Sequence, residues 1–318
     1  MHLLGLERTM YPKVSVIMAT YNSEKYVGLA IQSIINQSFS NFELIIVDDG
    51  SQDKTVLEIL KFKDTRIIFK AFTENKGVVS ARNWAIDNSV GEYIAIMDSD
   101  DISDPLRFEK QISYIEKQNA DICGTFHKDY YELTGKIKYR KGYILEQDLK
   151  ALLTIYSPLI HPSVIIKKTK LKKSPYSIVF EKAEEYALWC EMALNGAKIV
   201  CCPEYLLTYR IHPTQMTIRN KEKNRILTNE IRDEYIYKLL GISEIPKSMS
   251  FLKRIRKGLN FLTRLNQKIP NISWRVNYQI YARFQFHGNG ILTPIIRLER
   301  AVIAIWMTIY GIRNFKKN

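Results

Sequence analysis

Short apolar runs alternate with amphipathic segments along the first 125 residues of the chain. The apolar runs have the length and composition of buried strands: residues 14–18, 43–47, 66–69 and 92–97. Between them, apolar residues recur at helical spacing: residues 24–36, 53–60, 77–88 and those after Pro105. Strands that alternate with helices are typical of a largely parallel sheet with helices on both faces. We therefore predict an α/β fold for this part of the chain.

The regular alternation weakens after residue 125. Thr134 and Gly135 lie between polar and aromatic stretches, which predicts a β-hairpin within residues 130–143. Beyond it, the pattern predicts in order a helix at 148–156, a strand at 163–166, a helix at 185–194, and two short strands at 198–201 and 205–209. The rest of the chain has helical spacing, at residues 221–240 and 247–318, with three breaks: Pro246, Pro270 and residues 288–290.

Polar side chains follow the predicted strands at their carboxyl ends. Asn22 follows the first strand, Asp48 and Asp49 end the second, and an acidic cluster follows the fourth. In parallel sheets these ends meet at one edge, where ligands bind. The sequence therefore places a ligand site at this edge.

The cluster Asp98-Ser99-Asp100-Asp101 is the sharpest of these signals. Clustered carboxylates repel one another, so their burial is costly unless a cation lies among them. Hard oxygen ligands suit Mg²⁺ or Mn²⁺, which would also bridge a diphosphate. The alternative is a helix cap, which Asp104 before Pro105 would supply alone. For Asp48 and Asp49, a strand-to-helix turn through Gly50 is likewise the alternative to nucleotide binding.

Seven segments, in order, resemble the motifs of bacterial, inverting family 2 glycosyltransferases of the GT-A fold: residues 12–22, 47–51, 75–83, 98–101, 161–164, 183–189 and 209–212. The resemblance implies an α/β, nucleotide-sugar-binding, Rossmann-like mixed sheet with helices on both faces, followed by a helical C-terminal region. It divides the chain into an N-terminal extension, a GT-A catalytic domain with nucleotide-sugar and acceptor parts, and a basic helical region: residues 1–11, 12–220 (12–125 and 126–220) and 221–318.

The resemblance also implies a role for each matching residue. Tyr21 would lie against the nucleotide base and Asp49 would bind its polar edge, while Arg82 would lie near the base or the diphosphate. The full set expected around the donor is Ala19, Thr20, Tyr21, Asn22, Asp48, Asp49, Lys76, Arg82, Asp98 and Ser99. The metal, Mn²⁺ or Mg²⁺, would be held by Asp98, Asp100 and His212.

The expected catalytic base departs from the family pattern. The family usually has Glu-Asp where this chain has Glu184-Glu185, and the Asp is the base. Glu185 takes its place and is equally able to accept a proton from the acceptor hydroxyl. Glu184 remains an alternative, and both residues also suit the start of a helix, where the helix dipole favours acids.

Charge is concentrated towards the end of the chain. The net charge is +14, and residues 241–318 hold 14 Lys and Arg against 2 Asp and Glu, a net +12 in a chain of otherwise ordinary globular composition. An anionic partner is therefore expected. Because this region is also apolar, an anionic membrane surface suits it better than nucleic acid. A helical cap packed on the catalytic domain is the alternative that needs no partner.

Three further observations bound the function. Residues 19–25 contain no Gly, which counts against a nucleotidyltransferase, because such an enzyme typically holds a triphosphate with a Gly-rich loop. The cysteines form no CxxC pair, so we expect free, buried thiols: Cys123, Cys190, Cys201 and Cys202. No secretory signal and no run of about 20 apolar residues is visible, which predicts a cytoplasmic protein attached peripherally to the inner face of the cell membrane.

Together these features predict an inverting, metal-dependent glycosyltransferase of bacterial surface polysaccharide synthesis. It would move a sugar from a nucleotide-diphosphate sugar, best matched by a UDP-sugar, to a hydroxyl of a glycan or lipid-linked oligosaccharide acceptor. No nucleic acid partner is expected.

The last 25 residues yield a prediction of their own. Pro294 suits a helix start, and basic residues flank the uncharged run 301–312, which as a helix covers about 18 Å against about 30 Å of hydrocarbon. Such a helix would lie in the membrane interface. Deleting residues 294–318 should release the protein from anionic liposomes and leave transfer to a soluble acceptor largely intact. Unfolding of the truncated protein would show instead that this helix is part of the core.

Overall fold

The computed structural model describes residues 11–215, 221–242 and 251–285 of the chain. Most of the expected N-terminal extension, the breaks at Pro246 and residues 288–290, and the predicted interfacial helix at 294–318 lie outside these residues.

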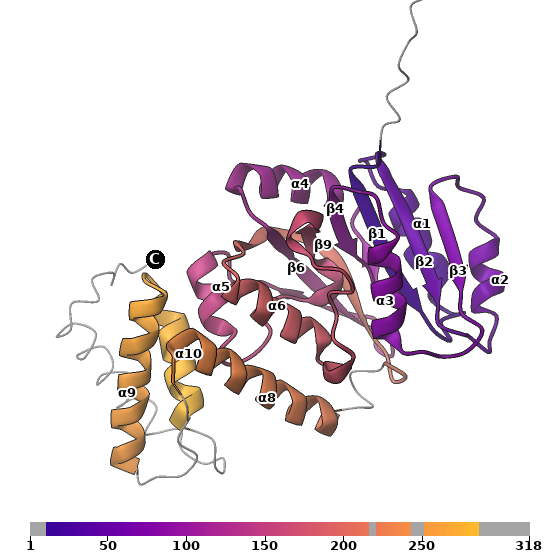
Figure 1. Ribbon diagram of the computed structural model, residues 1–318. Coiled ribbons are helices and arrows are strands. Elements are labelled where there is room, and N and C mark those ends of the chain that lie inside the picture. The colour runs from indigo at the N-terminus through magenta and orange to yellow at the C-terminus, as the bar shows by residue number, and fades with distance from the viewer. Residues whose placement is uncertain (1–10, 216–220, 243–250, 286–318) are drawn as a thin grey trace, which may run out of the picture.

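The described strands form one mixed sheet of nine strands in the order β3-β2-β1-β4-β8-β6-β9-β5, with β7 paired to β6 (Figure 1). Their bounds are β1 Val14–Thr20, β2 Phe42–Asp48, β3 Ile67–Ala71, β4 Tyr93–Ile96, β5 Ile102–Ser103, β6 Ile122–Tyr131, β7 Lys136–Arg140, β8 Ile165–Lys167 and β9 Ile199–Ile211. Strands β3, β2, β1 and β4 are parallel, as predicted, and β8 joins β4 in the antiparallel sense.

Helices cover both faces of the sheet. The described helices are α1 Val27–Ile35, α2 Thr55–Leu60, α3 Val78–Asp87, α4 Arg107–Gln118, α5 Glu146–Leu152, α6 Glu184–Leu194, α8 Lys221–Leu240, α9 Phe251–Lys268 and α10 Trp274–Gln285. Among the described residues, three 3-10 turns are also present: η1 His161–Ser163, η2 Lys168–Lys170 and η3 Ile178–Phe180. Helices α1, α2 and α4 pack on one face, and α3, α5 and α6 on the other. Strand β1 shows why: Val16 and Met18 face the first layer, while Ile17 faces the second.

Strand β9 differs from the prediction of two short strands at 198–201 and 205–209. It is a single strand of 13 residues that pairs with β6 along its whole length. Thr125 is opposite Cys202, Phe126 opposite Tyr205 and His127 opposite Leu207, so the bulge in β9 comprises Pro203, Glu204 and Leu206. A bulge absorbs a proline without ending the strand, because the bulged residues make no ladder hydrogen bond.

The C-terminal helices form a third cluster beside the sheet. Helix α8 packs on α6, α10 packs on α5, and α9 packs on α10 and α8, with Leu262, Leu265 and Val276 buried in this cluster. Pro270 lies between α9 and α10, as predicted. Among the described helices, none has the length and apolar content needed to cross a bilayer. All four cysteines are free and buried, which confirms that expectation.

Arg107, the first residue of α4, is fully buried where the sheet changes from parallel to antiparallel. Its guanidinium donates hydrogen bonds to the carbonyls of Ile96 at 3.0 Å and Val164 at 3.4 Å. Burial lowers the pKa of Arg107 to about 10, although nearby Asp101 opposes this shift. A buried cation therefore lies behind the acidic turn and joins the two halves of the sheet.

Replacing Arg107 with Leu should lower the free energy of unfolding by about 3 kcal/mol, because the buried carbonyl of Ile96 and the buried side chain of Gln111 lose this donor, while the carbonyl of Val164 keeps only the Ile96 amide. Urea denaturation followed by circular dichroism measures this change. Lys110→Leu on the same helix is the control: Lys110 pairs with Glu204 at the surface, and its loss should cost less than about 1 kcal/mol. Equal effects of the two substitutions would contradict the role given to Arg107.

Candidate functional site

The loops after β1 and β2 are tied to each other at the carboxyl edge of the sheet. Asn22 has a φ of 47°, and its amide donates to Ser51 Oγ at 2.9 Å while its side-chain oxygen accepts from the Gln52 amide at 2.8 Å. Asp48 accepts the Ser51 amide at 2.9 Å. Tyr21 lies beside these bonds with an exposed side chain. The two tips thus form one rigid rim with an aromatic ring open to solvent.

Asp49 is buried and anchors a third loop to this rim. Its two oxygens accept the amides of Lys76 at 2.7 Å and Gly77 at 3.0 Å. Burial raises the pKa of Asp49, although these two hydrogen bonds oppose the shift. Gly77 has a φ of 88° and directly precedes α3, so the loop needs a glycine here. Asp49 therefore positions the loop that carries Lys76, whatever else its oxygens bind.

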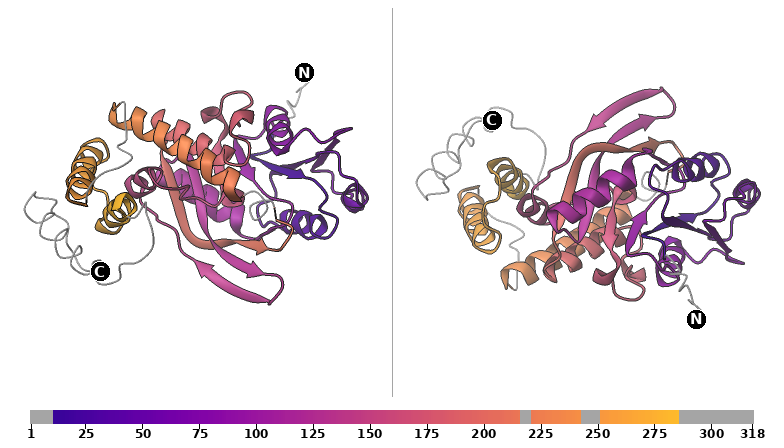
Figure 2. Two further views of the ribbon diagram at one scale, coloured as in Figure 1. Left: turned by 90° about the horizontal axis from the view of Figure 1, so that it is seen from below. Right: turned by 90° about the horizontal axis from the view of Figure 1, so that it is seen from above.

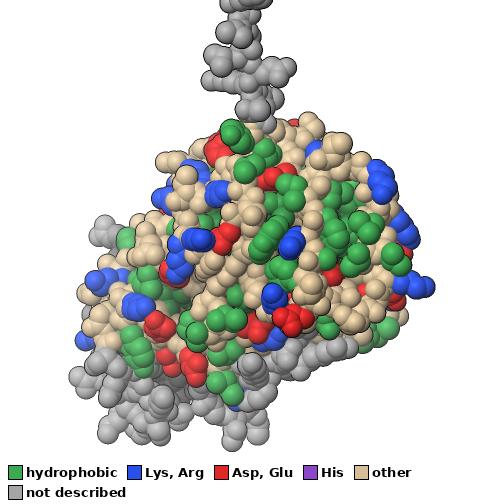
Figure 3. Space-filling view, turned by 45° about the vertical axis from the view of Figure 1, so that its right-hand side comes forward, with side chains coloured by type: hydrophobic (Ala, Val, Ile, Leu, Met, Phe, Trp, Pro, Cys, Tyr) green, Lys and Arg blue, Asp and Glu red, His purple; other side chains and the backbone are tan. Residues whose placement is uncertain are grey.

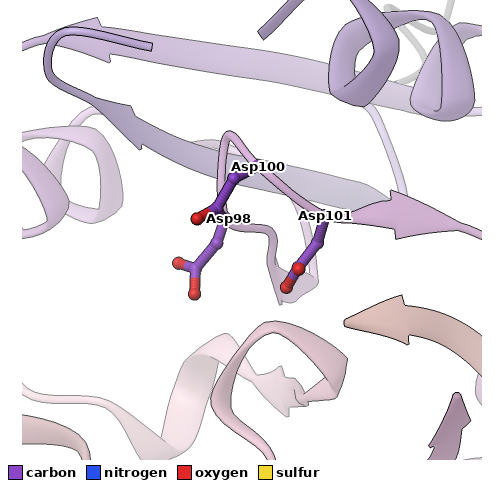
Figure 4. A group of neighbouring side chains, drawn as sticks. All are labelled: Asp98, Asp100 and Asp101. Carbon is purple, nitrogen blue, oxygen red and sulfur yellow. The ribbon is translucent and has the colours of Figure 1, made fainter. Parts of the chain in front are cut away.

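Three aspartates lie together on the turn after β4. One carboxylate oxygen from each of Asp98, Asp100 and Asp101 falls within 4.8 Å of the others, and Figure 4 shows the three side chains leaving the same turn. Burial raises the pKa of Asp98 and raises that of Asp101 well above its usual value, and the charge of Asp100 adds to both. The turn therefore holds more negative charge than its surroundings readily stabilise.

Arg210 on β9 holds this turn from the other side. Its amide donates to Asp101 Oδ1 and its side-chain Nε to the carbonyl of Asp100, both at 2.8 Å. The guanidinium also lies over the ring of Tyr26 at 5.0 Å. Asp101 Oδ2 is buried and has no hydrogen-bond partner among the described residues. The sequence prediction named neither Asp101 among the metal ligands nor Arg210 as a support of the turn, although both lie inside motifs that it identified.

His212, one residue beyond β9, faces Asp100. Its Nε2 lies 3.0 Å from Asp100 Oδ2, and its Nδ1 lies 2.8 Å from the Thr214 hydroxyl. The Tyr26 ring lies against it with centroids 4.6 Å apart, and the Tyr26 hydroxyl donates to Glu132 at 2.8 Å. When Nδ1 donates to Thr214, the lone pair of Nε2 is left for a cation.

Arg82 on α3 connects the acidic turn to α6. Its guanidinium donates to Asp98 at 2.9 Å and to Glu184 at 2.6 Å. Burial alone would lower the pKa of Arg82, but Asp98 and Glu184 outweigh it and hold the pKa above its usual value. The ring of Tyr176 lies 5.9 Å from this guanidinium, and its hydroxyl lies 2.8 Å from buried His161. Arg82 is therefore a fixed cation between two acidic groups.

Glu184 and Glu185 are in different environments at the start of α6. Glu184 accepts a hydrogen bond from Arg82 at 2.6 Å and another from the Lys182 amide at 2.8 Å. Among the described residues, no other side chain donates a hydrogen bond to Glu185. Burial raises the pKa of Glu185 to about 7, and the charge of Glu184 adds to the shift. A carboxylate with a pKa near neutral is suited to proton transfer, whereas Glu184 is occupied by its ion pair.

The other predicted donor residues line the same edge. Ser99 Oγ lies 3.0 Å from Ser23 Oγ, which links the acidic turn to the loop after β1. Ala19 and Thr20 end β1, and the Thr20 hydroxyl is buried with no hydrogen-bond partner among the described residues. The Lys76 ammonium lies 5.4 Å from the centre of the Phe72 ring. The structure thus brings the sequence-predicted residues to one edge of the sheet.

The acidic turn fits a hard divalent cation. Oxygens on opposite sides of Mg²⁺ lie about 4.2 Å apart at bonds of about 2.1 Å, close to the 4.8 Å that bounds this cluster. Asp101 has an oxygen with no hydrogen-bond partner among the described residues, and the imidazole of His212, outside this cluster, faces Asp100.

This edge site on a mixed sheet is that of a GT-A glycosyltransferase, and comparison with known proteins agrees. Residues 15–175 match the family model described as glycosyl transferase family 2. An uncharacterized glycosyltransferase of Methanocaldococcus jannaschii is 40% identical over 212 residues, 63% of this chain and 71% of that protein. The chain belongs to glycosyltransferase family 2.

A further relative and one solved structure are also similar to this chain. WfgD of Escherichia coli, named a UDP-Glc:alpha-D-GlcNAc-diphosphoundecaprenol beta-1,3-glucosyltransferase, is 30% identical over 211 residues, 64% of this chain and 79% of that protein. The crystal structure of S. aureus TarS 1-349 in complex with UDP-GlcNAc has a TM-score of 0.57 at 19% identity, covering 86% of this chain and 88% of that one. The second likeness concerns the fold alone.

Proposed function

We propose that this glycosyltransferase is inverting and metal-dependent, and that it moves a sugar from a UDP-sugar to a hydroxyl of a lipid-linked glycan. One observation carries the proposal: Arg82 joins Asp98 of the acidic turn to Glu184, the residue next to Glu185. The group that would hold a leaving diphosphate and the group that would take a proton therefore share one site. Inverting transfer needs both, with a single carboxylate as base.

The rim formed by the loops after β1 and β2 is the proposed nucleotide site. Tyr21 offers an exposed ring for the base, and Asp49 holds the Lys76 loop beside it. Lys76 and Arg82 are the cations nearest in sequence to the α3 N-terminus, where backbone amides favour an anionic group. The name of WfgD, which specifies UDP-Glc, supports a uridine donor.

The proposed metal ligands are Asp98, Asp100 and His212, with Asp101 added from the structure. A bound Mn²⁺ or Mg²⁺ would neutralise charge on the leaving diphosphate. Arg210 and Tyr26 would keep Asp100 and His212 facing each other, and Arg82 would keep the carboxylate of Asp98 oriented.

Glu185 is the proposed base and Glu184 its anchored neighbour. With a pKa of about 7, Glu185 is largely ionised at the slightly alkaline side of neutrality and can accept the proton of an acceptor hydroxyl. Glu184 instead neutralises Arg82. The environment of each carboxylate therefore favours one of the two alternatives that the sequence left open.

The acceptor and the membrane complete the proposal. The name of WfgD specifies a diphosphoundecaprenol acceptor, which supports a lipid-linked acceptor here and work at the anionic inner face of the cell membrane. Residues 12–220 would be the catalytic domain, with residues 126–220 on the acceptor side, and residues 221–318 the basic helical region.

The metal is tested at Asp100. Asp100→Ala should abolish transfer and remove the Mn²⁺ dependence of UDP binding, measured by isothermal titration, because the ion is the main link between this turn and the diphosphate. Asp64→Ala, which removes a carboxylate paired with Arg66 outside the turn, should leave both unchanged. Wild-type activity that persists in excess EDTA would rule the metal out.

The base is tested by its pH dependence. The log of kcat/KM should rise with pH up to about 7 and then level off, as Glu185 loses its proton. Glu185→Gln should lower kcat by about 10²-fold or more with donor binding little changed. If Glu184→Gln shows this loss while Glu185→Gln stays active, the assignment is one residue out.

Protein stability provides the control for this variant. Because burial raises the pKa of Glu185 in the folded state, the stability that it contributes is present below the unfolded pKa and is lost as pH rises through about 7. Gln cannot ionise, so Glu185→Gln should unfold at no lower a temperature than the wild type at pH 8. A fall in melting temperature would mean that the activity loss reflects damaged structure.

A further inference from the structure

The β6–β7 hairpin projects from the body of the molecule (Figure 2). It carries exposed apolar side chains. We define the hairpin arm as residues 132–145, the turn after β6, strand β7 and the segment that follows. Leu133 is 80% exposed and Tyr139 63% exposed. Three more large apolar side chains of the arm are exposed: Ile137, Ile144 and Leu145. So many apolar side chains on one short exposed segment mark an interaction surface.

The same arm is positively charged. It contains four basic residues and one acidic residue: Lys136, Lys138, Arg140, Lys141 and Glu132. Arg140 pairs with Asp129 at 2.5 Å, and Glu132 with Lys25 at 2.9 Å. Within the part of the chain that the structure describes, none of the three lysines pairs with a carboxylate. By contrast, basic and acidic side chains are interspersed across the face seen in Figure 3. The arm therefore favours an anionic partner.

The outer edge of β7 is open, because β7 pairs with β6 alone among the described strands. A second copy of the chain added there in antiparallel register about Lys138 would place Lys138 opposite itself and Lys136 opposite Arg140. Like charges directly opposite each other destabilise a strand pair, and edge lysines commonly prevent such pairing. Charge thus argues against a second copy at this edge.

We propose that the hairpin arm is a surface by which the protein contacts an anionic lipid bilayer, in addition to the C-terminal region for which the sequence predicts such contact. Along β7, Ile137 and Tyr139 point to one face of the ribbon and Lys136 and Lys138 to the other. The apolar face would lie at the acyl boundary, with Tyr139 at the level of the headgroups. The lysine side chains are long enough to reach around the ribbon to lipid phosphates. An acidic protein segment would use the lysines but would leave the apolar side chains exposed.

The arm is joined to the acidic turn by direct contacts. Glu132, at the start of the arm, accepts the hydrogen bond of the Tyr26 hydroxyl, and the Tyr26 ring packs on His212. Tyr131 is paired with Ile211, the residue before His212. Contact of the arm with a bilayer would therefore bring the edge of the site close to the lipid surface. The inference extends the proposed function by naming a membrane contact, and vesicle binding tests it without any transfer reaction.

The test uses the full chain and vesicles of phosphatidylcholine with or without phosphatidylglycerol, separated by flotation. The triple variant Lys136→Gln, Lys138→Gln, Lys141→Gln should bind the anionic vesicles at least about tenfold more weakly than the wild type. A second triple variant, Leu133→Ser, Ile137→Ser, Tyr139→Ser, should lose the binding that survives in high salt, because salt screens the charges but not the apolar contact.

A matched control on α2 and the loop after it separates the arm from general surface effects. Leu57 and Leu60 are exposed on this helix, and Lys63 is exposed just beyond it. Leu57→Ser, Leu60→Ser, Lys63→Gln should therefore change vesicle binding less than about twofold. All variants should unfold at the wild-type temperature, since the substituted side chains are exposed.

Tyr139→Trp locates the contact directly. The wild-type emission spectrum is subtracted from that of the variant, which leaves the signal of the introduced tryptophan. This signal should shift to shorter wavelength with anionic vesicles and stay unchanged with neutral ones. Arm variants that float like the wild type, or a Tyr139→Trp spectrum that does not respond, would overturn the proposal. Binding that is lost only on deletion of residues 294–318 would overturn it as well and would leave the tail as the membrane contact.

Discussion

The structure of the site depends on the repulsion among three carboxylates that leave one turn after β4. Asp98, Asp100 and Asp101 are brought within 4.8 Å of one another, and burial makes their ionised forms harder to stabilise. Arginines from three other elements stabilise this negative charge. Arg82 comes from α3 and Arg210 from β9. Arg107 lies buried behind the turn at the start of α4.

Each of these arginines also makes a contact outside the acidic turn, and these contacts connect the site to the rest of the fold. Arg107 bonds to carbonyls on both sides of the change in strand direction, and Arg210 packs against Tyr26 at the other edge of the site. Arg82 pairs with Glu184, whereas Glu185 forms no ion pair with any residue that the structure describes. Arg82 thus makes Glu184 and Glu185 chemically different: one is held in an ion pair and the other has a raised pKa. The sequence alone does not distinguish them.

The alternating pattern of the first 125 residues was enough to predict the parallel half of the sheet. Strands β1, β2 and β4 are short apolar runs buried on both faces, and the edge strand β3 is only partly covered but still begins with an apolar run. Strand β9 was predicted as two pieces, since Pro203 normally ends a strand and only its partner β6 reveals the bulge. The strand tips placed Asn22, Asp49 and Asp100 correctly at one edge. Contacts between distant segments, such as that of Arg82 with Glu184, leave no local signal in the sequence.

The bulge in β9 has a consequence for how this chain tolerates insertions. Side chains alternate along a strand, so adding or removing one residue reverses every side chain beyond that point. Between Leu207 and Ile211, where β9 pairs with β6 without interruption, such a change would turn Arg210 away from Asp100 and displace His212. At Pro203 and Glu204, and again at Leu206, the ladder is already interrupted, so a length change there is absorbed before the register reaches the site. Variation in length among related chains should therefore concentrate at the bulge and be rare beyond it.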